Sequence, residues 1–204
     1  MKLIIFDFDG VLVNTEEIAY QIHTIKNKDL TWKRFKEYSI GNFHENYNQA
    51  VKEGKHIPAD DYDGSYKKAL GVLTIQEILH NTILSLAPEN RLAIVSSTNG
   101  SFIQDFLAKE GLLQYFSDIL GSDVHISKTL KIRMILEKYN IMPVDAVFIT
   151  DTLGDIKEAN ECGVRSIAVT WGLHDRSVLE RGEPAKIVDD PQNLLKSIKE
   201  IQNG

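Results

Sequence analysis

Short apolar runs alternate with amphipathic stretches along most of the chain. Uninterrupted runs of Leu, Ile, Val and Phe are typical of buried strands, whereas apolar residues three and four apart indicate one face of a helix. The runs predict strands at 3–6, 92–96, 146–150 and 166–170, with weaker ones at 119–120 and 186–188. The spacing between them predicts helices at 74–86, 102–110, 131–139 and 156–162. This alternation predicts an α/β fold with a doubly wound, Rossmann-like parallel sheet and right-handed crossovers.

The segment from Asn14 to about Gly71 departs from this rhythm. It is rich in Lys, Tyr, Asn, Glu and His and contains no run typical of a buried strand. It predicts several short helices, with loops around 54–58 and 59–64, and it is longer than one crossover requires. We therefore expect a catalytic core formed by residues 1–13 and 73–204, and a small α-helical cap formed by residues 14–72, inserted after the first strand.

The composition is that of a globular protein and argues against several partners. The chain has 204 residues, of which 43% are hydrophobic, and this is enough for a sizeable core. The net charge of −6 gives no electrostatic case for binding nucleic acid or an anionic membrane. A single cysteine excludes an intramolecular disulfide framework, and no apolar run is long enough to form a signal segment or cross a bilayer. We expect a cytoplasmic protein, and nothing in the sequence indicates its oligomeric state.

The most informative motif is Asp-Phe-Asp-Gly at positions 7–10, directly after the first predicted strand. It places Asp7 and Asp9 at the carboxyl edge of the sheet, where open α/β sheets bind their ligands. Two carboxylates so close together repel each other, and a cation or a raised pKa is the usual remedy. A calcium loop of the EF-hand type would need acids at the positions of Val11 and Ile18, so that interpretation is disfavoured.

Other polar groups follow the remaining predicted strands. The segment 96–100, Ser-Ser-Thr-Asn-Gly, follows the second strand, Lys128 precedes a predicted helix, and Asp151 and Asp155 follow the strand at 146–150. Taken singly, each has an ordinary explanation as a helix cap, a surface lysine or an acid in a first helical turn. Because all of them follow candidate parallel strands, we expect them to form one site.

This order of motifs resembles the haloacid dehalogenase superfamily of hydrolases, in particular the subgroup of phosphoglycolate phosphatases and β-phosphoglucomutases with a helical cap after the first motif. The first motif, residues 7–12 followed by Asn-Thr at 14–15, carries most of the resemblance. The chain has Thr150 where family members usually have Gly, and Lys-Thr-Leu-Lys at 128–131 where they often have Lys-Pro-x-Pro. Either Lys128 or Lys131 can therefore be the motif lysine. We prefer Lys128, because it precedes the predicted helix.

The resemblance implies an Mg²⁺-dependent phosphatase that hydrolyses a small phosphate monoester through an aspartyl-phosphate intermediate. Asp7 would be the nucleophile, and Asp9 would protonate the leaving alcohol and then activate water. Asp7 and Asp151 would hold Mg²⁺ with the backbone carbonyl of Asp9, and Asp155 would hold a metal-bound water or orient Lys128. The residues implied to bind the phosphoryl group, through side chains or backbone N–H groups, are Phe8, Gly10, Ser96, Ser97, Asn99 and Lys128.

Several alternatives stay open at this point. A dehalogenase of the same superfamily would not need Asp9, and a sugar-phosphate mutase usually has His at the position of Ala19. A phosphonate-cleaving enzyme would need an imine-forming lysine in the cap. A signalling receiver domain uses similar residues in a different order, and a catalytically silent phospho-ligand-binding protein is expected to lack an acid or the lysine. We therefore expect a phosphatase whose partner is a small phosphorylated metabolite.

Overall fold

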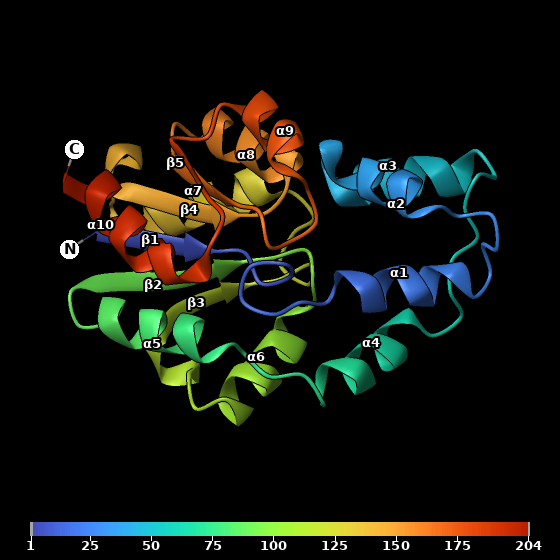
Figure 1. The fold of residues 1–204 in the computed structure, drawn as a ribbon, viewed down its shortest axis with the longest axis horizontal. Helices are drawn as coiled ribbons and strands as arrows, with labels where there is room; N and C mark the ends of the chain where they lie inside the picture. The colour runs from blue at the N-terminus through green and yellow to red at the C-terminus, as the bar shows by residue number, and fades with distance from the viewer. Residues whose placement is uncertain (1, 204) are drawn as a thin grey trace.

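The computed structural model describes residues 2–203, and its centre is one parallel six-stranded sheet (Figure 1). The strand order is β3-β2-β1-β4-β5-β6. The strands are β1 (Lys2–Phe6), β2 (Asn90–Val95), β3 (Phe116–Leu120), β4 (Ala146–Thr150), β5 (Arg165–Val169) and β6 (Lys186–Val188). The order reverses between β1 and β4, so these neighbours flank the switch point at which doubly wound sheets bind ligands. The predicted fold class is confirmed.

Helices cover both faces of the sheet. Successive side chains of a strand point to opposite faces, so Ile4 packs in a cluster with α5, α6 and α10, and Ile5 in a second cluster with α7 and α8. The helices that flank the sheet are α5 (Glu77–Leu86), α6 (Gly100–Lys109), α7 (Lys128–Tyr139), α8 (Leu153–Glu161), α9 (Arg176–Leu179) and α10 (Leu194–Asn203). Burial on both faces explains why the central strands consist mostly of apolar residues.

The segment between β1 and α5 forms a group of small helices beyond the carboxyl ends of the strands (Figure 1). They are α1 (Glu16–Thr24), α2 (Trp32–Glu37), the 3₁₀ helix η1 (Tyr38–Ile40), α3 (Phe43–Lys52) and α4 (Tyr62–Leu70). Part of this group packs around Leu30, Phe35 and Tyr38 in a cluster of its own. No helix among residues 2–203 has the length and apolar character that a membrane span requires.

Two helices begin at other residues than the pattern predicts, because a capping side chain sets the start of each. The helix predicted at 131–139 begins at Lys128, because the Ser127 hydroxyl accepts the Leu130 N–H at 3.3 Å. The expectation that Lys128 precedes this helix is therefore wrong. The loop predicted at 59–64 is also wrong at its end, since Asp61 caps α4, which begins at Tyr62.

Two further elements begin earlier than the pattern predicts. The short strand predicted at 119–120 begins at Phe116; β3 lies at an edge of the sheet and includes polar residues, which hide it in the sequence. The helix predicted at 156–162 begins at Leu153, where the Thr152 side chain caps it. Gly163 adopts φ +70° just after this helix, in agreement with its predicted role in ending it.

Candidate active site

Asp7 lies at the centre of the site, immediately after β1. Its backbone N–H donates to the Ile149 carbonyl of the neighbouring strand at 2.9 Å, which extends the parallel pairing of β1 and β4 by one residue. One carboxylate oxygen accepts the Phe8 N–H at 2.7 Å, and the other accepts the ammonium of Lys128 at 2.6 Å. Burial raises the pKa of Asp7 well above its usual range, although Lys128 offsets part of this shift.

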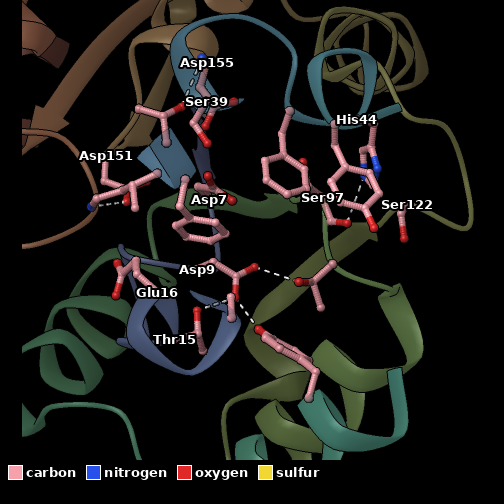
Figure 2. Close-up of a pocket in the computed structure, with 18 of the residues that line it drawn as sticks. Asp7, Asp9, Thr15, Glu16, Ser39, His44, Ser97, Ser122, Asp151 and Asp155 are labelled. Carbon is pink, nitrogen blue, oxygen red and sulfur yellow. Dashed lines mark hydrogen bonds between the residues drawn. The ribbon is translucent and has the colours of Figure 1, made fainter. Parts of the chain in front are cut away.

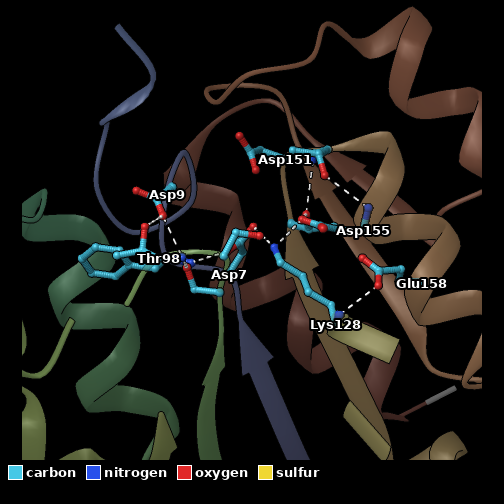
Figure 3. Close-up of polar contacts among 12 residues, drawn as sticks. Asp7, Asp9, Thr98, Lys128, Asp151, Asp155 and Glu158 are labelled. Carbon is cyan, nitrogen blue, oxygen red and sulfur yellow. Dashed lines mark hydrogen bonds and ion pairs between the residues drawn. The ribbon is translucent and has the colours of Figure 1, made fainter. Parts of the chain in front are cut away.

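Lys128 bridges two acids, Asp7 after β1 and Asp155 in the first turn of α8 (Figure 3). Its Nζ donates to Asp7 at 2.6 Å and to Asp155 at 2.8 Å, and all three side chains are buried. Burial alone would lower the pKa of Lys128, but the carboxylates of Asp155 and Asp7 raise it overall. Burial alone would raise the pKa of Asp155, but the ammonium of Lys128 lowers it overall. The lysine therefore stays charged between the carboxylates.

Glu158 of α8 holds the first turn of α7, and with it the backbone of Lys128. Its Oε1 accepts the N–H groups of Lys128 at 2.8 Å and Thr129 at 3.2 Å, and the Ser127 hydroxyl at 3.3 Å. The two N–H groups are donors that the first turn of a helix leaves without a partner inside the helix, and a negative charge there also interacts favourably with the helix dipole. No local sequence pattern predicts this contact, because Glu158 lies 30 residues from Lys128 in the chain.

Asp151 follows β4 and is enclosed by the loop after β5. Its Oδ2 accepts the Leu173 N–H at 2.7 Å, and its carbonyl accepts the His174 N–H at 3.2 Å. Its Oδ1 is buried and has no hydrogen-bond partner within residues 2–203. Burial raises the pKa of Asp151 to about 7, although the Leu173 N–H acts in the opposite direction. A side chain at Gly172 would overlap the Asp151 carboxylate, so the loop needs glycine for this close approach.

The acidic cluster has the donor set expected of a magnesium site. Carboxylate oxygens of Asp7, Asp151 and Asp155 lie within 4.8 Å of one another, and all three residues are buried. Hard oxygen ligands of this kind suit Mg²⁺. The Oδ1 of Asp151, which is buried without a hydrogen-bond partner among the described residues, is free to act as a ligand, and burial raises the pKa of both Asp7 and Asp151. The residues therefore fit a divalent cation.

Asp9 lies on the other side of the same turn and is held by hydroxyl groups (Figure 2). One carboxylate oxygen accepts the Thr15 hydroxyl at 2.5 Å and the phenol of Tyr66 from α4. The other accepts the Thr98 hydroxyl at 2.7 Å, with the Ser96 hydroxyl at 3.4 Å. Gly10 adopts φ +70° next to Asp9, and a side chain there would overlap Glu16 and Asp151. This turn therefore lets the two aspartates face different partners.

The residues predicted to bind the phosphoryl group differ in their access to the cavity. Ser97 and Asn99 line it, and so does Lys128. Ser96 is fully buried, with its hydroxyl accepting the Thr98 N–H at 3.0 Å. The ring of Phe8 is also fully buried, and it packs edge-on against Phe106 in the core. For Phe8, only the backbone can contact a ligand.

Glu16 is an acid of the site to which the sequence analysis assigns no role. It is the first residue of α1, and Figure 2 shows it below Asp151 and beside Asp9. Its Oε1 is buried and has no hydrogen-bond partner in the described part of the chain. Burial raises the pKa of Glu16 to about 8, and the neighbouring Asp151 adds to the shift.

The acids open into a cavity of about 300 Å³ between the sheet edge and the small helices. This is the lower end of the range for small-molecule sites. The small helices contribute side chains from α1, α2, α3 and α4 to its lining. Both Asp7 and Asp9 line the cavity, so their carboxylates are accessible to a bound molecule.

A family model described as haloacid dehalogenase-like hydrolase matches residues 4–169. The chain belongs to this family of hydrolases. A phosphoglycolate phosphatase from Synechococcus elongatus is 23% identical over 98% of this chain and 99% of its own length. The structure of a predicted phosphatase from Clostridium acetobutylicum has a TM-score of 0.80 at 23% identity and covers 98% of both chains. A hydrolase of the same family from Streptococcus pneumoniae has a TM-score of 0.78 at 22% identity, over 97% of this chain and 98% of that one. The predicted family is confirmed.

The geometry of this hydrolase brings in residues to which the sequence analysis assigns no role. Thr98 and Thr15 belong to the motifs at 96–100 and 14–15, and their hydroxyl groups donate to Asp9. The sequence could have identified both as polar residues of the site. Tyr66 carries no sequence signal, because it reaches Asp9 from 57 residues away in the chain. The loop at 171–174, which follows β5, also contributes to the site, because Leu173 lines the cavity.

Proposed function

We propose that this hydrolase is an Mg²⁺-dependent phosphatase that cleaves a small phosphate monoester through an aspartyl-phosphate at Asp7. The observation that carries the proposal is the separation of two acids on one turn. Asp7 is bound to Lys128 beside a cluster of carboxylates, whereas Asp9 is bound only to neutral groups. Paired carboxylates with different surroundings are typical of an enzyme that uses them for different steps.

In this proposal Asp7 attacks the phosphorus atom, and its position in the cavity lining at the end of β1 supports that role. Attack forms a bond from a carboxylate oxygen to phosphorus and breaks the bond to the leaving alcohol. Asp9 supplies a proton to that alcohol and then removes one from the water that hydrolyses the acyl phosphate. Its hydroxyl partners hold the carboxylate toward the cavity while the proton moves.

Lys128 is the better of the two candidate lysines for the phosphoryl group. It lines the cavity and contacts Asp7, whereas Lys131 is fully buried and donates to the carbonyls of Ser96 at 2.5 Å and Gly121 at 3.3 Å. A fixed positive charge beside the nucleophile stabilises the phosphoryl oxygens through the transition state. The N–H groups of Phe8 and Gly10 already donate to the Asp7 carboxylate and the Val13 carbonyl, so neither is free for the phosphoryl group. The backbone N–H of Asp9 and the polar side chains of Ser97 and Asn99 would assist Lys128 instead.

Asp7, Asp151 and Asp155 would hold Mg²⁺, with the backbone carbonyl of Asp9. The bound ion would neutralise part of the negative charge that a carboxylate and a phosphate bring together. Glu16, which lies beside Asp151, adds a further acid at the edge of this cluster.

The small helices of residues 14–72 act as a cap in this proposal, since they cover the acids and supply much of the cavity wall. Ala19 lies in that wall, at the position where sugar-phosphate mutases usually have His. A wall with alanine here favours hydrolysis over phosphoryl transfer back to a sugar. Phosphoglycolate, which the name of the Synechococcus relative gives as its substrate, is one candidate among several small phosphate monoesters.

The experiment is phosphate release from p-nitrophenyl phosphate and a panel of alkyl phosphates, with Mg²⁺ or with excess EDTA. We expect turnover that requires Mg²⁺. The Asp7→Asn variant should lose at least about 1,000-fold in kcat and fail to form an acyl phosphate that can be trapped with acid. No turnover on any substrate, or an unchanged rate in EDTA, would contradict the proposal. Mass spectrometry of Asp7→Asn checks that deamidation has not restored aspartate.

A further inference from the structure

Aromatic side chains form most of the cap side of the cavity. Phe43 and Tyr47 of α3 stack with ring centroids 6.0 Å apart, and Tyr47 lies 5.4 Å from the ring of His23. His23 lies 5.0 Å from Tyr62, which stacks on Tyr66 at 5.8 Å. All five rings line the cavity. They form a continuous wall from the first turn of α3 to the phenol that contacts Asp9.

This wall contains no charge that would hold an anionic group. Among the described residues that line the cavity, Lys128 is the only lysine or arginine, and its ammonium is already bound to Asp7 and Asp155. Burial lowers the pKa of His23 to about 4, and burial also lowers the pKa of His44. Both imidazoles are therefore neutral near pH 7. A carboxylate placed against this wall would lose its hydration without gaining a positive partner.

The acids of the cavity do not provide the wall with a free counter-ion for a cation. Asp9 meets the wall at the phenol of Tyr66, but its two oxygens accept hydrogen bonds from Tyr66, Thr15 and Thr98. Glu16 lies against Asp151, at the edge of the metal cluster. Asp63 follows Tyr62 on α4, but it is exposed to solvent. Flat aromatic faces without a buried counter-ion suit stacking with a planar apolar group.

Building on the proposed phosphatase activity, we propose that the preferred substrate is the phosphate monoester of an alcohol that carries an aromatic or similar planar apolar group and no carboxylate. The phosphoryl group would lie between Asp7 and Lys128, and the ring would stack on the wall of Phe43, Tyr47 and Tyr62. The cavity of about 300 Å³ has room for one such ring beside the phosphoryl group.

The test compares kcat/KM for benzyl phosphate, n-propyl phosphate, O-phosphoethanolamine and 2-phosphoglycolate, all with Mg²⁺. These are esters of alkyl alcohols, so the greater acidity of a phenol does not favour the aromatic substrate. We expect benzyl phosphate to exceed 2-phosphoglycolate by at least about 10-fold, mainly through KM. Benzyl phosphate should also exceed the propyl and ethanolamine esters.

Variants of the wall separate stacking from general effects on the enzyme. Phe43→Arg adds the missing positive charge and should shift the benzyl-to-glycolate ratio toward glycolate by at least about 10-fold. Phe43→Leu keeps an apolar side chain but removes the ring, and it should raise KM for benzyl phosphate while leaving KM for propyl phosphate nearly unchanged. Trp32→Arg is the matched control, because Trp32 is a cap aromatic that does not line the cavity. The benzyl-to-glycolate ratio of this variant should match that of the unmodified protein. Circular dichroism and Tm verify that each variant is folded.

The outcomes distinguish this inference from the proposed function. Turnover of every ester with 2-phosphoglycolate or phosphoethanolamine preferred would overturn the inference and leave the phosphatase activity standing. An unchanged selectivity ratio in folded Phe43→Arg would also overturn it. Absence of turnover on all esters would instead contradict the proposed function.

Discussion

At the scale of single residues, the surroundings of Asp9 define its chemistry. The hydroxyl groups of Thr15, Tyr66 and Thr98 converge on its carboxylate from three parts of the chain. They can rotate to donate or accept as the carboxyl group changes its protonation, whereas the ammonium beside Asp7 can only donate. Asp9 is therefore suited to proton transfer and Asp7 to nucleophilic attack.

We expect Asp9→Asn to lower kcat for an alkyl phosphate by about 100- to 10,000-fold, the usual contribution of general acid–base catalysis. The loss should be smaller for p-nitrophenyl phosphate, because nitrophenolate leaves without a proton. Steady-state kinetics on both esters measure the difference. The control is Thr98→Val, which removes one hydrogen bond to Asp9 and should cost much less. Equal losses on both esters in Asp9→Asn would argue that Asp9 has no role as an acid.

At the scale of elements, the contact between α8 and α7 fixes the lysine. Glu158 is 9% exposed and collects the N–H groups of the first turn of α7. It also accepts a hydrogen bond from Asn42, which precedes α3, at 3.3 Å. One carboxylate thus links the start of α7 to a residue of the predicted cap.

We expect Glu158→Ala to lower the free energy of unfolding by about 1–3 kcal/mol, because it leaves buried donors without partners. It should also lower kcat moderately, since Lys128 loses the support of its backbone. Thermal unfolding and steady-state kinetics measure the two effects. Glu161→Ala is the matched control on the same helix, where a single bond to the Thr129 hydroxyl at 3.2 Å is lost. If both variants behaved alike, Glu158 would have no special part in placing α7.

At the scale of the whole molecule, the site is a concentration of buried negative charge. In the absence of metal, burial raises the pKa of Asp7 well above its usual range, that of Asp151 to about 7 and that of Glu16 to about 8. Each group binds its proton more tightly in the folded chain than in the unfolded chain. The stability that these protons contribute is complete below about pH 4 and is lost as the pH rises through the folded-state values near 7 and 8.

We therefore expect the metal-free protein to lose several degrees of Tm between pH 7 and pH 8.5 through these groups, a range in which His23, whose pKa is lowered by burial, is mostly neutral in both the folded and the unfolded chain. Mg²⁺ should stabilise the protein more at pH 8.5 than at pH 7, because ionised carboxylates bind it. Thermal scans in EDTA and in Mg²⁺ across this range check both statements. Asp151→Asn removes one of the titrating groups and should flatten the profile in EDTA. A profile in EDTA that rises toward pH 8.5 would contradict the assignment of these pKa shifts.

The sequence alone determined the sheet and the positions along it that carry chemistry. Uninterrupted apolar runs identify β1 and β4, because strands buried on both faces consist mostly of apolar residues. Parallel strands end at one edge, so Asp7 and Asp151 could be expected to meet there. The edge strand β3 and the starts of α7 and α8 were predicted less well, since exposed edges and capping side chains leave no periodic signal.

Only the tertiary structure decided which groups surround the two aspartates. Tyr66 and Glu158 reach their partners from 57 and 30 residues away, and no local pattern encodes a contact at such separation. The tertiary structure also decides between Lys128 and Lys131, which both lie near the start of α7. In the packed protein Lys128 lines the cavity, whereas Lys131 is fully buried. Local sequence specifies strands and helices through short-range periodicity, whereas a site forms from side chains that come together when those elements pack.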